Sequence, residues 1–301
     1  TGGPYSTTTR GGAAALPEIR KLIFDGDLIR AHRLFGRRLM GMPIEQQKYQ
    51  SLGSLVLRLP EGGAVTDYRH ALDLDTAIAT TTYTQGGARF TREVFVTPVD
   101  QVIVVRLTSD QPGRISLSAQ LRGQRNTAHS NYATDYFQMD GYGSDGLVVR
   151  GKSADYLGVA GRLRYEARLK AVTQGGAMSV DDADLVIRNA DSVTLFVAAA
   201  TNFVNFTDVS ADPRARVDAV ILAAAARPLE ALRLDHVAAH QKLFRRVAMT
   251  LPATADSYLP TDERLKKFTG ANDPSLASLV FQFGRYLLIS SSRPGTQPAN
   301  L

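Results

Sequence analysis

Residues 163–171 read Leu-Arg-Tyr-Glu-Ala-Arg-Leu-Lys-Ala, and this stretch decides the class of fold. Apolar side chains alternate here with charged ones at every second position. That period is typical of a β-strand with one face in a core and the other in water. The same alternation recurs at 55–59, 89–96 and 115–122. Several such strands separated by glycine-containing turns predict a large antiparallel sandwich.

Two stretches break the alternation in an informative way. Residues 102–105 and 193–197 are continuous apolar runs, which indicates central strands that are covered on both faces. No apolar run approaches the roughly 20 residues that a membrane-spanning helix needs, so we expect no membrane segment.

Helical periodicity flanks the predicted sandwich on both sides. Residues 14–41 predict two short helices with a break at Asp25-Gly26-Asp27, and helical spacing returns after Asn205. Thr261 is the predicted N-cap of one helix, and Asp273-Pro274 begins the last one. Residues 276–289 of that last helix are apolar on every side, so we expect neighbours on the same or on a second polypeptide to bury it.

Composition excludes several classes of function. The chain has 301 residues and a net charge of +6, but its basic residues form no block, so nucleic-acid binding is set aside. It has no cysteine, which excludes disulfides and thiolate chemistry. The sequence also has no G-x-S-x-G motif, no glycine-rich phosphate loop and no convincing catalytic set.

Three groups of polar residues are candidate sites. His236 and His240 have the i, i+4 spacing of a two-histidine metal site. A zinc hydrolase would have glutamate beside the first histidine, but this sequence has Val237 there. We therefore predict that the two histidines belong to a polar helix face and bind no metal. Asp73 and Asp75 are expected on the wet side of a strand, and Asp181-Asp182 in a turn.

Residues 132–142 are rich in aromatic and amide side chains, the groups that bind sugar rings. The alternative interpretation is a long loop that packs on its own sheet. The chain has no tryptophan, which weakens the case for a separate sugar-binding module. A non-catalytic carbohydrate-binding sandwich nevertheless stays open as a second function.

Three stretches of the sequence, together with Thr1-Gly2-Gly3-Pro4-Tyr5, resemble one enzyme family. They are Tyr49–Leu55 with Thr66–Ala77, then Thr91–Phe95 with Asp100–Leu107, and finally Phe281–Leu301, which ends in Ser-Ser-Ser-Arg-Pro-Gly-Thr-Gln-Pro-Ala-Asn-Leu. Together they are similar to glycoside hydrolase family 95, the inverting α-L-fucosidases. The last stretch is the most specific of the three.

The resemblance implies a mainly β protein with helical segments, divided into four parts. These are an N-terminal loop with short helices packed on the sandwich (1–45), a β-super-sandwich (46–205), a helical linker (206–250) and the start of a truncated (α/α)6 catalytic barrel (251–301).

The same resemblance implies an α-L-fucosidase, a hydrolase that releases terminal α-L-fucose by acid and water catalysis without a cofactor. Its catalytic residues would follow Leu301, so none is expected in this chain. Its partners would be a fucosylated oligosaccharide or polysaccharide and the rest of the barrel. A periplasmic or extracellular location is expected. A related glycosidase or phosphorylase, or an enzyme that prefers α-L-galactosides, is the alternative.

The turn after the last helix is the predicted edge of the substrate pocket. Arg293, Thr296, Gln297 and Asn300 leave a barrel helix toward the pocket and are the candidate substrate-binding residues. The alternative is that Pro294 and Pro298 merely fix a connection between helices.

Overall fold

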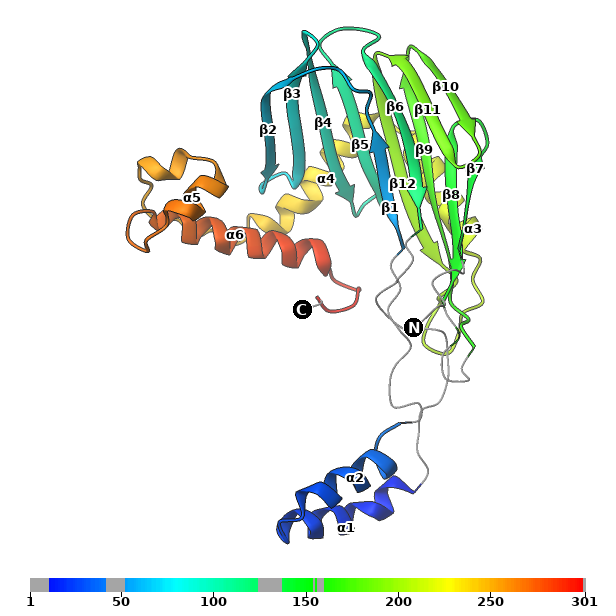
Figure 1. Cartoon of the computed structure of the whole chain (residues 1–301), viewed down its shortest axis with the longest axis vertical. Helices are drawn as coiled ribbons and strands as arrows, with labels where there is room; N and C mark the ends of the chain where they lie inside the picture. The colour runs from blue at the N-terminus through cyan, green and yellow to red at the C-terminus, as the bar shows by residue number, and fades with distance from the viewer. Residues whose placement is uncertain (1–10, 42–51, 124–136, 154, 156–159, 300–301) are drawn as a thin grey trace.

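The computed structural model describes residues 11–41, 52–123, 137–153, 155 and 160–299, and its centre is a sandwich of two antiparallel sheets (Figure 1). The smaller sheet has the order β1 (Ser54–Arg58), β6 (Ile115–Arg122), β11 (Asp184–Ala190), β10 (Ala177–Asp181). The larger sheet has the order β2 (Val65–Asp73), β3 (Ile78–Gln85), β4 (Ala88–Thr97), β5 (Val102–Ser109), β12 (Ser192–Thr201), β9 (Arg164–Gln174), β8 (Gly146–Lys152), β7 (Phe137–Tyr142). The predicted mainly β fold with a sandwich is confirmed.

The core between the sheets follows from the alternation along the strands. Leu195 and Val197 of β12 point inward and pack with Leu117 of β6 and Leu185 of β11. Phe196 lies between them in sequence and faces the opposite side of the larger sheet, where helices cover it. The central strands β5 and β12 therefore carry buried side chains on both faces, as their continuous apolar runs predict, although Ile103 of β5 is 39% exposed.

Six α-helices lie in the described residues. They are α1 (Gly12–Phe24), α2 (Leu28–Arg38), α3 (Pro213–Ala225), α4 (Leu229–Phe244), α5 (Thr261–Lys267) and α6 (Pro274–Ser291), with a short 3₁₀ helix at Ala255–Tyr258. Val217 and Ile221 of α3 and Leu232 of α4 pack on Phe196 and form a second core on the outer face of the larger sheet. No helix in these ranges is long and apolar enough to cross a membrane.

The polar face of β9 does not lie in water as the alternation suggests. Glu166 and Arg168 are 3% and 1% exposed because α3 covers them. Arg168 pairs with Glu166 on its own strand and with Asp218 of α3, and its guanidinium lies 4.0 Å from the centre of the Tyr142 ring. Charged side chains can be buried when they pair with each other. Strand periodicity cannot distinguish such a buried polar face from a polar face that is exposed to solvent.

The two ends of the chain differ from the sequence expectation in detail. The break between α1 and α2 falls where predicted, and Asp27 caps α2 by accepting from the Arg30 N–H at 3.1 Å. Thr261 is the first residue of α5 and not its N-cap, which is Pro260. The predicted boundaries at 45, 205 and 250, and the packing of segment 1–45 on the sandwich, stay predictions.

Helix α6 is largely uncovered by the described residues. Only Leu276 and Ile289 are buried along it, whereas Val280, Phe283 and Leu288 are 60%, 44% and 57% exposed. A run of exposed large apolar side chains on one helix marks a surface that is buried by another element.

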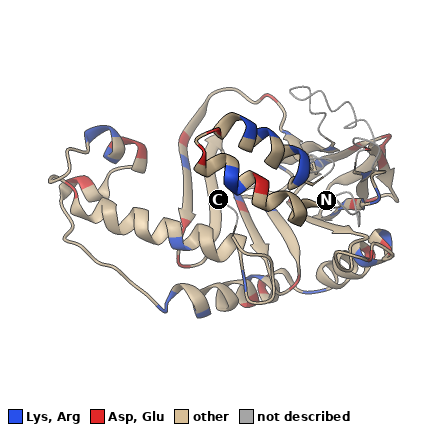
Figure 2. Cartoon of the chain, turned by 90° about the horizontal axis from the view of Figure 1, so that it is seen from below, with Lys and Arg blue, Asp and Glu red and all other residues tan. Residues whose placement is uncertain are grey.

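Charged groups are distributed differently: Figure 2 shows Lys and Arg scattered among Asp and Glu on most elements, in agreement with the absence of a basic block.

Candidate functional site

A cleft of about 400 Å³ opens where one end of the larger sheet meets α4 and the end of α6. This volume is in the range of small-molecule sites. Strand and turn residues form one wall, helix and turn residues the other. The lining residues are Leu72, Ala77, Ala79, Val94, Phe95, Val96, Pro98, His236, His240, Tyr286, Ser290, Ser291, Ser292, Arg293 and Thr296.

The turn after α6 brings two of the four predicted site residues to this cleft. Thr296 closes the turn, because its hydroxyl accepts from the Arg293 N–H at 2.9 Å and lies 2.8 Å from the Arg293 carbonyl. Gly295, at φ 86°, supplies the left-handed backbone that this turn requires. Thr296 therefore braces the turn and holds Arg293 at the cleft.

Arg293 is the charged group of the cleft lining. Its guanidinium forms no ion pair within the described ranges, and burial lowers its pKa below the ordinary value. A partly buried guanidinium without a carboxylate offers several N–H donors to the oxygens of a ligand. Of the other two candidates, Gln297 does not line the cleft, and Asn300 lies outside the described residues.

The two histidines are core residues and not part of a wet helix face, which corrects the sequence expectation. His240 is 1% exposed, its Nε2 lies 2.9 Å from the Leu74 carbonyl oxygen, and its ring stacks on Phe244 with centroids 5.1 Å apart. His236 is 2% exposed, packs on Phe95 at 5.0 Å, and has no hydrogen-bond partner for either ring nitrogen in the described structure.

Burial is the main cause that lowers the pKa of both imidazoles, so the neutral forms are favoured. Their i, i+4 spacing brings no third ligand with it. Within the described ranges, no group of three or more His, Asp or Glu side chains could hold a metal ion. The histidines instead pack α4 against the end of the sheet.

Asp75 fastens the turn between β2 and β3 to α4. Arg245 donates to both carboxylate oxygens at 2.8 and 2.5 Å, and Gln241 donates at 2.8 Å. The hydrogen bond from Arg245 is the largest cause that lowers the pKa of Asp75. Asp75 is exposed to solvent, as expected, with its side chain 41% exposed, but it lies in the turn after β2 and not on the strand. Asp73 accepts from the Asp75 N–H within this turn at 2.9 Å.

Helix α6 is fastened to α4 in turn. Arg285 donates to the carbonyl oxygens of Leu243 and Val247 at 3.2 and 2.6 Å, and its guanidinium lies over the Phe244 ring. Tyr286 of α6 meets the His240 ring at 6.2 Å. The cleft is thus built from sheet, linker and last helix together, and spacing along the sequence gave no signal for Tyr286 or Phe95.

The other candidate segments fall elsewhere. Asp181 is the last residue of β10, and Asp182 begins the predicted turn to β11 at φ 51°. Of the aromatic stretch 132–142, residues 137–142 form β7, and the rest lies outside the described residues. Tyr142 is engaged by Arg168 and lies 3.5 Å from an Asp218 oxygen, so it contributes to packing.

The comparisons with known proteins give the family of the two parts of this chain. Residues 1–206 match the model "Glycosyl hydrolase family 65, N-terminal domain", and the chain belongs to this family. Residues 228–301 match "Glycosyl hydrolase family 95 catalytic domain". The resemblance to family 95 that the sequence motifs indicate is confirmed.

Similar proteins are named as fucosidases. The chain is 32% identical to "Alpha-L-fucosidase 2" of Arabidopsis thaliana, over 100% of its own length and 38% of that protein. It is 29% identical to "Probable alpha-fucosidase A" of Aspergillus niger, with the same coverage of 100% and 38%. The chain therefore spans about two fifths of the length of these relatives.

Among solved structures, the chain is similar to one titled "Putative kojibiose phosphorylase from human microbiome". The TM-score is 0.48 at 10% identity, covering 67% of this chain and 29% of that one.

Proposed function

We propose that this chain is the N-terminal scaffold and pocket edge of an α-L-fucosidase that releases terminal α-L-fucose from glycans with inversion. The observation that carries the proposal is the position of the turn after α6. The segment that matches the family 95 catalytic domain includes this turn, and the turn places Arg293 at a cleft of about 400 Å³. The names of the relatives supply the substrate class.

The chemistry of this proposal needs groups beyond those described. In an inverting hydrolase one carboxylic acid protonates the leaving oxygen while an activated water attacks the opposite face of the sugar ring. The family resemblance assigns these groups to positions after Leu301. In this chain Arg293 would donate to sugar hydroxyls, Thr296 would hold the turn, and Gln297 and Asn300 would continue the rim.

The exposed apolar side of α6 supports the second part of the proposal. Val280, Phe283, Leu287 and Leu288 are each more than two fifths exposed here. Burying a side chain of this size contributes about 1.5–3 kcal/mol, so a covering element gains substantially from contact with them. We propose that the other helices of an (α/α)6 barrel, on the same or a second polypeptide, cover this side.

The test is mutagenesis at the turn in the complete enzyme that contains this chain, with an aryl α-L-fucoside as substrate. Arg293→Ala is expected to lower kcat/KM by about 10- to 100-fold, since a hydrogen bond from a charged group contributes roughly 1.5–3 kcal/mol. The thermal midpoint is expected to stay unchanged, and Arg293→Lys to restore part of the activity. Gln297→Ala is expected to have a smaller effect.

Arg188→Ala is the matched control, because Arg188 is an exposed arginine on the outer part of β11. A loss of activity at Arg293→Ala that merely follows a loss of folded protein would refute the role in binding. An aryl α-L-galactoside measured in parallel decides between the two sugars, which differ by one hydroxyl at C6.

We also propose that the protein acts in the periplasm or outside the cell, where extended fucosylated glycans are met. Cell fractionation of the native source, followed by the fucosidase assay on each fraction, tests this location. Activity confined to the cytoplasmic fraction would contradict it.

A further inference from the structure

The cleft between the larger sheet and the end of α6 has two walls of opposite character. Every lining residue from β2, β3, β4 and the turns after β2 and β4 is apolar, and these residues are here called the strand wall. The lining residues from α4, α6 and the turn after α6 are an arginine, two histidines, a tyrosine, a threonine and three serines. A ligand that fits between the two walls has one apolar side and one side that forms hydrogen bonds.

The apolar character of the strand wall is local to the cleft. The strand β4 carries Thr91-Arg92-Glu93 in its middle and Val94-Phe95-Val96 where it reaches the cleft. Val96 is 60% exposed, and Ala79 and Pro98 of the same wall are half-buried. Accessible apolar side chains that gather in one place are typical of a binding surface.

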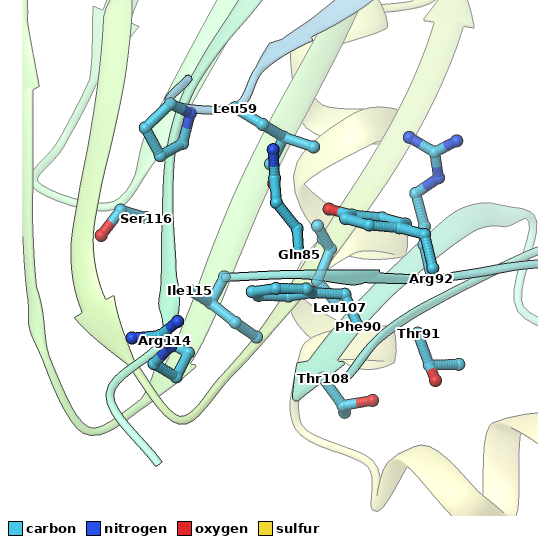
Figure 3. Close-up of a pocket in the computed structure, with 12 residues that line it drawn as sticks. Leu59, Gln85, Phe90, Thr91, Arg92, Leu107, Thr108, Arg114, Ile115 and Ser116 are labelled. Carbon is cyan, nitrogen blue, oxygen red and sulfur yellow. The ribbon is translucent and has the colours of Figure 1, made fainter. Parts of the chain in front are cut away.

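A second hollow, between the two sheets, also includes residues of β3 and β4 but has different properties. Figure 3 shows Gln85, Phe90 and Arg92 around it, so polar and apolar side chains are mixed and not separated on two walls. Its volume is about 50 Å³, whereas small-molecule sites have roughly 300–1,000 Å³. The cleft, at about 400 Å³, lies within that range.

A 6-deoxy sugar with the configuration of galactose matches the two walls of the cleft. Its hydroxyl groups at C2, C3 and C4 can accept from a guanidinium such as that of Arg293 and can exchange hydrogen bonds with serine and threonine hydroxyls. Its C–H bonds at C3, C4 and C5 form an apolar patch on one face of the ring, and the C6 methyl group extends this patch.

We propose that the strand wall contacts this apolar patch through Ala79, Val96 and Pro98, and thereby selects a 6-deoxy sugar over the corresponding sugar with a hydroxymethyl group. The inference rests on the proposed function, since it concerns the same cleft and takes the fucoside from the names of the relatives. The additional hydroxyl of a hydroxymethyl group finds no polar side chain on the strand wall. An apolar pocket favours one methyl group, or disfavours an added hydroxyl, by about 10- to 100-fold.

Three aryl glycosides with the same leaving group test the selection in the complete enzyme that contains this chain. At C5 the α-L-fucoside carries a methyl group, the α-L-galactoside a hydroxymethyl group, and the β-D-arabinopyranoside, which has the same ring configuration, only hydrogen. The kcat/KM of the fucoside is expected to exceed that of each of the other two by about 10-fold or more. Equal values for the fucoside and the arabinopyranoside, or a preference for the galactoside, would overturn the proposal.

Val96→Thr assigns the selection to the strand wall, because threonine has nearly the shape of valine and adds a hydroxyl that can pair with that of the galactoside. The ratio of kcat/KM for fucoside over galactoside is expected to fall by about 10-fold, and the thermal midpoint to stay the same because Val96 is exposed. Val172→Thr is the matched control: Val172 is 40% exposed on β9 and does not line the cleft, so the ratio should stay unchanged. An equal effect of Val96→Thr on all three substrates, or no effect, would show that the wall does not contact the sugar.

Calorimetric titration with free L-fucose, L-galactose and D-arabinose separates this inference from the proposed function. If the complete enzyme hydrolyses none of the glycosides but binds L-fucose at least 10-fold more tightly than the other two sugars, the proposed hydrolysis is wrong and the role of the strand wall is supported. If it hydrolyses the fucoside but binds the three sugars equally, the hydrolysis is supported and the role of the wall is wrong. If it neither hydrolyses nor binds any of them, both proposals are wrong.

Discussion

Replacing Glu166 by Leu should destabilise the protein strongly, although the two side chains are similar in size. Glu166 is 3% exposed and pairs with Arg168, which is 1% exposed, and also accepts from Arg150 Nε at 3.3 Å. Removal of one partner of a buried pair costs about 3–5 kcal/mol because the other charge stays buried. Arg168 keeps Asp218 and the Tyr142 ring, so we expect the lower end, about 3 kcal/mol.

The double variant Glu166→Leu/Arg168→Met should recover most of this loss. Replacing a buried ion pair by apolar residues of similar volume is often neutral. Urea unfolding monitored by circular dichroism measures both variants, with a midpoint shift of about 1 M for the single variant. Glu263→Leu, at an exposed position on α5, is the control and should change stability by about 0.5 kcal/mol or less. A double variant as unstable as the single one would refute the buried-pair reasoning.

Three further predictions concern pH and metals. Arg264 lowers the pKa of Asp273 from 3.8 to about 2. The stability that this pair contributes is therefore present above pH 4 and is lost as the pH falls toward 2. The difference in urea midpoint between the wild type and Asp273→Asn should disappear over the same pH range. Burial lowers the pKa of His236 below 6.5, so the unfolded chain binds the proton at a higher pH than the folded chain does. The stability of the folded state should therefore fall as the pH drops below about 6.5. The thermal midpoint of His236→Leu should fall less between pH 7 and pH 5 than that of the wild type. The acid and water scheme needs no metal, so EDTA should leave fucosidase activity of the complete enzyme unchanged, and a loss that zinc restores would reopen the question of a metal site.

The sandwich was predictable from the sequence because strand periodicity is a local signal. The sequence pattern of a strand shows which of its faces are apolar. One face is apolar in 163–171, and both faces are apolar in 102–105 and 193–197. What covers a polar face is a tertiary property. Asp218 comes from a helix about 50 residues beyond Arg168, and no local pattern connects the two.

The candidate site was predictable only in part, and for the same reason. The motif after α6 led to Arg293 and Thr296, which the structure places at the cleft. The histidine pair was visible as a spacing, but its role in packing follows from contacts with Leu74 and Phe95, which are more than 140 residues away in sequence. A metal-site pattern and a packed helix face look alike until these contacts are known.

The cleft is lined by the larger sheet as well as by α4 and the end of α6. His240 of the linker bonds to the Leu74 carbonyl at the end of the sheet and touches Tyr286 of α6, so one buried ring joins three segments that are far apart in the chain. Asp75 and Arg245 repeat the connection at the surface, where an ion pair alone contributes about 1 kcal/mol or less. The orientation of α6, and with it the position of Arg293, therefore depends on the hydrogen bonds from Arg285 to Leu243 and Val247 and on the contact between His240 and Tyr286. If α6 opens a catalytic barrel, as proposed, a barrel separated from this sandwich would lose one wall of the cleft.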